Sequence, residues 1–203
     1  MPRFITASIL ALTLAGAVPA FANSSSKFES SLTAPVNSAV KVEVIIGEDL
    51  AYRADNLPKD LRDRSSARSL NDGFGGNGFY GERDINRLAD RLQRKIEKRL
   101  EKEGVVMDAN ADTVIRLVIT DAKPNRPTFK QLSKNASLSY RSFGIGGASF
   151  EGEIIAAGGE TLGDLSYAWY ESNIRDAAYG STWSDANRAI DRFARKTAKT
   201  LNN

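Results

Sequence analysis

The sequence predicts an α+β domain in which two amphipathic helices pack on one face of a single sheet of about four strands. Three observations support this fold class. Several runs are alternating or β-branched, as in strands; two long segments carry apolar residues at helical spacing; and these segments follow the order β-α-β-β-β-α. This order favours one sheet that is covered by helices on one side.

The first strand and the first long helix are expected at 40–46 and 82–103. In the strand, three valines alternate with charged residues, as in a half-buried strand. In the helix, apolar residues recur at steps of three and four, and Gly104 follows as a stop signal. These apolar residues are Ile85, Leu88, Ala89, Leu92, Ile96 and Leu100.

The remaining elements are a central strand, a hairpin and a last helix. The β-branched run over 113–120 predicts a strand that is covered on one or both faces. Alternating residues over 148–154 and 165–169, with Gly158 and Gly159 between them, predict a hairpin. The last helix is indicated by the spacing of Trp183, Ala186, Ile190, Phe193, Thr197 and Leu201.

An export signal is expected at the N-terminus. Arg3 precedes an apolar run, and the small-x-small pattern at 20–22 is typical of a signal-peptidase site. The run is shorter than the about 20 apolar residues of a membrane span. Residues 1–22 are therefore expected to be a cleaved signal peptide, which predicts a periplasmic protein.

The remainder, 23–203, has the size of one domain. We expect it to begin with a loose Ser-rich lead over 23–38, which has little apolar surface to bury. The stretch 53–81 combines charged residues with a glycine cluster, which indicates a flexible surface loop.

The composition excludes several classes of function. The net charge of the whole chain is +3, and removal of Arg3 with the signal peptide lowers it to +2, so bulk charge gives no argument for nucleic-acid binding. The chain has no Cys and no His. It therefore has no disulfide, no ordinary Ser-His-Asp or Cys-His nucleophile and no His-ligated zinc site.

Two motif matches are interpreted as loops. Overlapping G-x-G-x-x-G patterns lie between Gly73 and Gly81, but no strand pattern precedes them, as a dinucleotide site would require. Asp108, Asn110 and Asp112 match the first half of a calcium loop, but the later positions that need Gly and Glu hold Thr and Ile. The sequence therefore predicts no cofactor and no metal ligand.

Neither the carboxylates nor the aromatic side chains predict a catalytic residue. Glu151, Glu153 and Glu171 are the candidates for acid–base chemistry on a glycan, but Glu151 and Glu153 alternate with apolar residues and should be solvated. Four aromatic residues could form a sugar-stacking platform, but their spacing along the strand and the last helix is typical of core residues. They are Tyr167, Trp169, Tyr170 and Trp183.

Basic residues form ridges beside the apolar stripes of both long helices. They lie at steps of three and four, and Asp90 and Asp191 are expected to pair with Arg94 and Arg195 one turn along. Two interpretations stay open: a solvated face, and contact with anionic envelope material such as lipid headgroups or acidic polysaccharide. The contact residues would be Arg87, Arg91, Arg94, Lys98, Arg188, Arg192, Arg195 and Lys199.

Several short motifs together resemble a family of uncharacterised bacterial envelope proteins, many of them predicted lipoproteins. The motifs are Asp112–Leu117, Thr120–Pro124, Gly146–Glu153, Gly159-Glu160, and Trp183–Ala186 with Phe193-Ala194. The resemblance implies an α+β envelope domain of unknown function without catalytic residues. This chain lacks the lipid-acceptor Cys of such lipoproteins, so it is expected to be soluble.

The sequence thus predicts a non-catalytic periplasmic protein that acts in binding or envelope assembly, with an envelope protein or an anionic polymer or lipid as partner. Two alternatives remain. One is an enzyme that acts on cell-wall or exported glycan through carboxylates, which would need a pair of buried carboxylates in a cleft. The other is a lipid or polymer carrier, which would need an enclosed apolar cavity.

Overall fold

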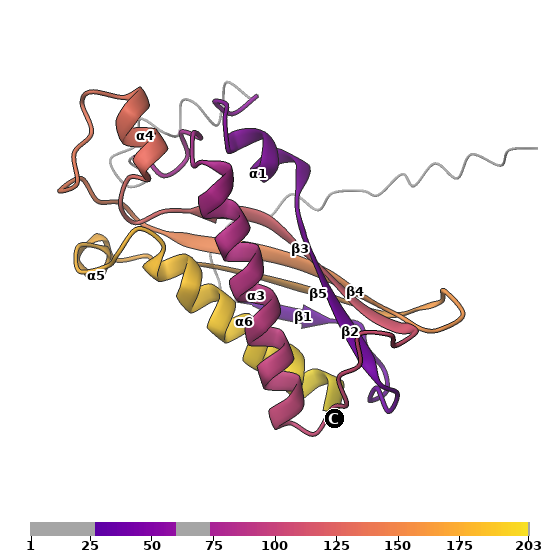
Figure 1. Cartoon of the computed structure of the whole chain (residues 1–203). Helices are drawn as coiled ribbons and strands as arrows, with labels where there is room; N and C mark the ends of the chain where they lie inside the picture. Colours follow the sequence, from indigo (N-terminus) through magenta and orange to yellow (C-terminus); the bar gives the residue numbers. More distant parts are fainter. Residues whose placement is uncertain (1–26, 60–73, 203) are drawn as a thin grey trace, which may run out of the picture.

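The computed structural model describes residues 27–59 and 74–202 as an α+β fold with one five-stranded sheet (Figure 1). The sheet has the spatial order β1-β5-β4-β3-β2; β2 is parallel to β3, and the other neighbours are antiparallel. The strands are β1 (Phe28–Ser30), β2 (Val40–Ile46), β3 (Thr113–Lys123), β4 (Gly147–Ile155) and β5 (Thr161–Tyr170).

The predicted α+β class is confirmed, but the sheet has five strands where about four were expected. The additional strand, β1, lies in the lead that was expected to be loose, and that expectation is wrong for Phe28–Ser30. The reason is Phe28, whose ring lies 6.2 Å from that of Phe193 and 6.5 Å from that of Tyr167. Two aromatic contacts of the partly buried Phe28 thus anchor an otherwise polar segment to the sheet and to α6.

Both long helices, α3 (Glu82–Lys102) and α6 (Ser184–Asn202), pack on the same face of the sheet, as predicted. Figure 1 shows them side by side and running in the same direction. The ring of Phe193 stacks on Phe150 at 4.9 Å and on Tyr167 at 6.0 Å. These stacked rings fill the centre of the interface between α6 and the sheet.

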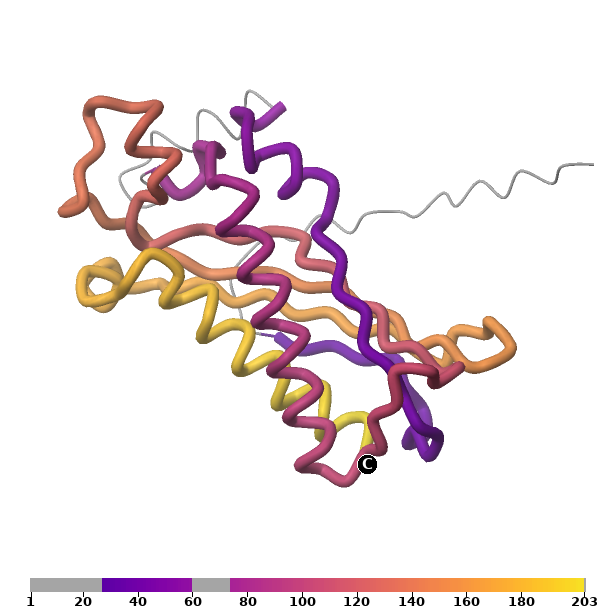
Figure 2. Tube along the Cα trace, in the orientation of Figure 1, coloured from indigo at the N-terminus to yellow at the C-terminus, as the bar shows by residue number. Residues whose placement is uncertain are grey.

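Three short helices were not predicted: α1 (Glu48–Arg53), α4 (Phe129–Lys134) and α5 (Ile174–Ala177). They are too short to show apolar periodicity. Figure 2 shows α4 and α5 at the same end of the sheet as the first turns of α3 and α6, and the predicted hairpin turn over 156–160 at the other end. One end of the molecule therefore gathers loops and helix starts.

The described part of the glycine-rich loop, 74–81, packs against the start of α4. Phe74 is 5% exposed, and Tyr80 is fully buried. The side chain of Gln131, fixed in the capping box at the start of α4, donates to the carbonyls of Phe74 (3.3 Å) and Gly78 (3.0 Å). The predicted signal peptide over 1–22 and the loop residues 60–73 lie outside the described residues.

The second face of the sheet is the more exposed one. Val118 lies on this face and is half-buried, whereas its neighbours Leu117 and Ile119 are buried under the helices. On the same face Arg116 contacts Glu153 (2.9 Å) and Glu43 (3.5 Å), which confirms that this side of the hairpin is solvated. The central strand is thus covered by helices on one face.

Candidate functional site

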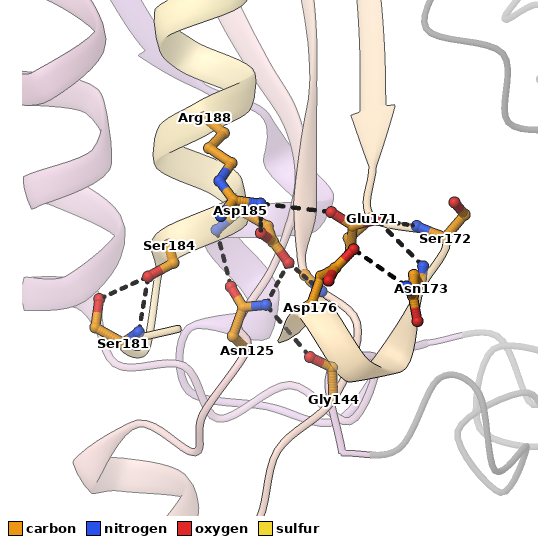
Figure 3. Close-up of polar contacts among 11 residues, drawn as sticks. Asn125, Gly144, Glu171, Ser172, Asn173, Asp176, Ser181, Ser184, Asp185 and Arg188 are labelled. Carbon is orange, nitrogen blue, oxygen red and sulfur yellow. Dashed lines mark hydrogen bonds and ion pairs between the residues drawn. The ribbon is translucent and has the colours of Figure 1, made fainter. Parts of the chain in front are cut away.

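A buried pair of polar side chains, Asn125 and Asp185, lies where α6 begins (Figure 3). Asn125 is fully buried, and Asp185 is 1% exposed. The backbone N–H of Asp185 donates to Oδ1 of Asn125 (2.9 Å), and Nδ2 of Asn125 donates to Oδ2 of Asp185. Nδ2 also donates to the carbonyl of Gly144 (3.4 Å), and the N–H of Gly146 to Oδ2 of Asp185 (3.4 Å). We call these four residues the Asp185 clasp.

The Asp185 clasp joins three segments: the chain after β3, the chain before β4 and the start of α6. The backbone of Asn125 also donates to the carbonyl of Thr182 (2.7 Å) and accepts from the N–H of Gly144 (2.9 Å). A Cβ atom at Gly146 would lie 2.6 Å from Oδ1 of Asn125, so only glycine leaves room for this amide. Because the buried donors and acceptors are matched within the chain, the clasp is a structural element.

A second carboxylate, Glu171, lies beside the clasp. Arg188 contacts Oε2 of Glu171 (3.4 Å) and Oδ1 of Asp185 (3.4 Å), so one guanidinium bridges two carboxylates. Oε1 of Glu171 accepts from the backbone N–H groups of Ser172 (2.9 Å) and Asn173 (3.1 Å). These contacts, drawn in Figure 3, engage both oxygens of each carboxylate and favour a structural role.

A polar network of Arg53, Asp121 and Tyr170 ties α1 to the sheet. Nη2 of Arg53 and the hydroxyl of Tyr170 each donate to Asp121, both at 2.5 Å. Burial alone would raise the pKa of the Asp121 carboxyl, but the charge of Arg53 and the two hydrogen bonds outweigh it, so the pKa lies below its usual value. Burial, followed by the charge of Asp121, raises the pKa of the Tyr170 hydroxyl.

The turn at 108–112 behaves as the sequence predicts. The N–H of Asn110 donates to Oδ1 of Asp108 (2.9 Å), which is a local turn contact. Among the described residues, no group of His, Cys, Asp and Glu side chains is arranged to hold a metal ion. The helices described here also include none that is long and apolar enough to cross a membrane.

The structure separates the predicted contact residues into two groups. Three of them make specific contacts: Arg91 lies 3.6 Å from Asp191, Arg188 bridges the two carboxylates, and Arg192 stacks on the ring of Trp169 at 4.3 Å. Asp191 also contacts Lys95 (2.9 Å), so it faces α3, and the expected pairing with Arg195 on its own helix is wrong. The contacts of Asp191 with Arg91 and Lys95 join α3 and α6, whereas Arg192 joins α6 to β5.

The other five form what we call the exposed ridge, and all are solvent-exposed. Within the described part of the chain none of them has an ion-pair partner, so the predicted pairing of Asp90 with Arg94 is not formed. Since α3 and α6 lie side by side on the sheet, their outer surfaces form one layer (Figure 1). The exposed ridge consists of Arg87, Arg94, Lys98, Arg195 and Lys199.

The helix layer is positively charged although the chain is nearly neutral. Residues 82–102 contain eight basic and five acidic residues, and 184–202 contain five basic and two acidic residues. The two helices therefore carry a net charge of +6 in a chain of net +3, so the rest of the chain has an excess of acidic residues. This separation of charge gives the helix layer a positive field.

An open groove of about 770 Å³ lies at the end of this layer. It is bounded by the first turns of α3 and α4 and by the segment before α6, and Arg87 belongs both to the groove and to the exposed ridge. Its lining residues are Asp55, Gly81, Glu82, Arg83, Asp84, Arg87, Arg126, Pro127, Thr128, Phe129, Lys130, Tyr140, Gly180, Ser181 and Thr182.

Arg126 holds two walls of this groove in place. Its Nε donates to the carbonyl of Gly180 (3.2 Å), and Nη1 donates to the carbonyls of Tyr140 (3.4 Å) and Arg141 (3.1 Å). Nη2 donates to the carbonyl of Ala178. The partners of this guanidinium in the described chain are carbonyl dipoles and the ring of Phe143, so no carboxylate neutralises its charge.

The aromatic residues considered as a sugar platform lie elsewhere. Tyr167 (2% exposed) and Trp183 (8% exposed) belong to the core, as predicted. Trp169 and Tyr170 are partly exposed, but Trp169 lies under Arg192, and Tyr170 donates to Asp121. Two aromatic side chains that sequence reasoning did not single out, Phe129 (77% exposed) and Tyr140 (74% exposed), line the groove instead.

The comparisons with known proteins do not assign the chain to a family. No protein-family model matches the chain, and no curated protein matches it either. Two solved structures of the PelC dodecamer from Paraburkholderia phytofirmans, one of them a point variant, are similar in structure. They are 11% and 10% identical, cover 88% of this chain and 98% of PelC, and give TM-scores of 0.46. Scores this low do not establish a common fold, and the envelope-family resemblance stays a prediction.

Proposed function

We propose that this protein is an exported, non-catalytic binding protein of the cell envelope, and that its exposed ridge contacts an acidic polysaccharide. The observation that carries the proposal is the layer of unpaired cations on α3 and α6, in a chain whose other parts have an excess of acidic residues. Such a layer attracts a polyanion through many weak contacts that salt screens.

A polysaccharide fits this surface better than a lipid headgroup layer. The exposed ridge leads through Arg87 into the groove, so cations follow a path along the molecule. A chain polymer can occupy a ridge and a groove together. A membrane surface is flat and would reach only the ridge.

The two alternatives have less support. For the glycan enzyme, Glu151 is exposed, Glu153 pairs with Arg116, and Glu171 and Asp185 share Arg188. None of these four carboxylates lines the groove. For the carrier, the stacked rings of Phe150, Phe193 and Tyr167 occupy the helix–sheet interface where an apolar cavity would be needed.

The experiment compares polymer binding by two variants with equal loss of charge. In the ridge variant Arg94, Lys98, Arg195 and Lys199 are changed to Gln; in the control variant Lys27, Lys59, Lys134 and Arg175 are changed to Gln, all exposed and outside the helix layer. Binding to long-chain polygalacturonate is measured at low salt by sedimentation or calorimetry, with anionic lipid vesicles in a parallel arm.

We expect wild type and control variant to bind polygalacturonate and the ridge variant to bind it at least about tenfold more weakly. Melting temperatures should stay nearly equal, because exposed charges contribute little to stability. Equal binding by the ridge and control variants would contradict the proposal, and so would binding to vesicles without binding to the polymer.

A further inference from the structure

The groove has features that the exposed ridge lacks, and they indicate what kind of ligand unit it accepts. Three cations that line it have no carboxylate partner in the described chain: Arg83, Arg87 and Arg126. Two of the three carboxylates that line the groove have polar partners in the described chain. Asp55 contacts Lys130, and Asp84 accepts from the indole N–H of Trp183 (3.3 Å). Arg83 and Arg87, which are both exposed, therefore present their guanidinium groups to solvent, and Glu82 is the one carboxylate of the lining without a polar partner in the described chain.

The other lining groups are hydroxyls and exposed rings. Ser181 and Thr182 supply hydroxyls on one wall, and Phe129 and Tyr140 supply rings that are 77% and 74% exposed. Aromatic side chains that have an apolar ring and a polar edge are enriched at binding surfaces. An aromatic ring can pack against the C–H face of a pyranose, while hydroxyl and guanidinium groups bond its oxygens.

The groove is also preformed. Arg126 ties the chain at 140–141 to the chain at 178–180, and these two segments carry Tyr140 and Gly180 of the lining. The Asp185 clasp fixes the start of α6 directly behind Ser181 and Thr182. A ligand would therefore meet walls whose positions are already set, which lowers the cost of binding.

We propose that this groove binds one or two units of an acidic saccharide, with the carboxylate held by Arg83 and Arg87 and a sugar ring packed on Tyr140. This inference rests on the proposed function and deepens it, since it names the chemical class that the protein selects. The exposed ridge attracts any polyanion, whereas the groove distinguishes a uronate from a neutral sugar of the same shape.

The probe is trigalacturonate, and its methyl ester serves as the uncharged ligand with the same rings. Binding is followed by the fluorescence of the tryptophans, because Trp183 contacts Asp84 of the groove. The groove variants are Arg83→Gln with Arg87→Gln, and separately Tyr140→Ala. The matched controls are Lys134→Gln with Arg175→Gln, and Tyr179→Ala, a tyrosine that is 93% exposed outside the lining residues.

We expect wild type and controls to bind trigalacturonate and to bind its methyl ester at least about tenfold more weakly. Each groove variant should lose binding by a similar factor, with an unchanged melting temperature. Wild type that binds the ester as well as the acid, or groove variants that bind as wild type does, would overturn the inference. So would absence of trigalacturonate binding at low salt.

The ridge variant separates this result from that of the proposed function. It should bind trigalacturonate as wild type does and bind the long polymer more weakly, because a trimer is too short to follow the helices. If the long polymer binds through the ridge but the trimer does not bind, the groove inference fails alone. If the trimer binds but the ridge variant keeps full polymer binding, the exposed ridge proposal fails alone.

Discussion

Two sets of polar residues lie at the end of the molecule where α3 and α6 begin, and they differ in how their hydrogen bonds and charges are matched. In the Asp185 clasp, the buried donors and acceptors find partners inside the chain. In the groove, the guanidinium groups of Arg83 and Arg87 face solvent without a carboxylate partner in the described residues. Polar residues that satisfy one another hold a fold together, whereas those left unmatched at a preformed surface are available to a ligand.

This comparison predicts opposite phenotypes for the two sets. Changes in the clasp should lower stability, and changes in the groove or the exposed ridge should lower binding with stability unchanged.

The largest effect is expected for Asp185→Ala. It removes a buried carboxylate that accepts from the amide of Asn125 and from the N–H of Gly146, and it leaves Arg188 with Glu171 as its remaining carboxylate. The free energy of unfolding, measured by urea titration, should fall by about 2–4 kcal/mol, because Asn125 and Gly146 each lose a hydrogen bond to a buried charged group. Glu151→Ala, which removes an exposed carboxylate, serves as the control and should change it by less than about 0.5 kcal/mol.

If Asp185→Ala fails to fold, Asp185→Asn gives the same information. It keeps the shape and loses the charge that contacts Arg188, so the loss should be smaller but still above that of Glu151→Ala. Equal stability of Asp185→Asn and Glu151→Ala would show that the clasp does not hold α6.

A second prediction concerns two adjacent residues on opposite faces of β3. Leu117 is fully buried under the helices, so Leu117→Ala should cost about 2–4 kcal/mol of unfolding free energy. Val118 is half-buried on the other face, so Val118→Ala should cost less than about 1 kcal/mol. Chemical denaturation of both variants checks this, and equal losses would contradict the assigned register of the sheet.

A smaller effect, with a defined pH dependence, is expected for Asp121→Asn. The pKa of Asp121 is lowered in the folded state, so its contribution is present above the unfolded value of about 3.9 and is lost as pH falls through the folded value. At neutral pH the substitution should cost about 2 kcal/mol, since it weakens the contacts with Arg53 and Tyr170.

The measurement is the difference in unfolding free energy between wild type and Asp121→Asn as a function of pH. The difference should be constant between about pH 5 and 7 and should shrink below about pH 4. A difference that grows on acidification would mean that the carboxyl is protonated in the native state.

The sequence alone predicted the helices and strands in which apolar residues recur at a regular spacing. The spacing in α3 and α6 predicted both helices, and the alternation in β2, β4 and β5 predicted their strands, because each pattern reflects one buried face. β1 was missed because it is three residues long and is held mainly by Phe28. The sequence did not show whether Val118 is buried, because a continuous β-branched run does not reveal which face of a strand is covered.

The candidate site was predictable only in part. The basic ridges follow from the spacing of charges along two helices. Which of these cations lack an ion-pair or ring partner depends on how α3 and α6 pack against each other and on the sheet. Arg91 lies at the seam opposite Asp191, and Arg192 lies over Trp169, so neither is available. Arg126, Tyr140 and Asp185 were missed because they lie far apart in the sequence and carry no periodic signal. Only the fold brings them to one end of the sheet.

The most direct test of the contrast between matched and unmatched polar groups is the salt dependence of polygalacturonate binding by wild type and the ridge variant. The ratio of their affinities should be largest at low salt and should fall steeply towards physiological ionic strength, where the screening length is about 8 Å. Unfolding free energies of the two proteins should agree within about 0.5 kcal/mol throughout. A ratio that does not change with salt, or a ridge variant that is clearly less stable, would contradict the account.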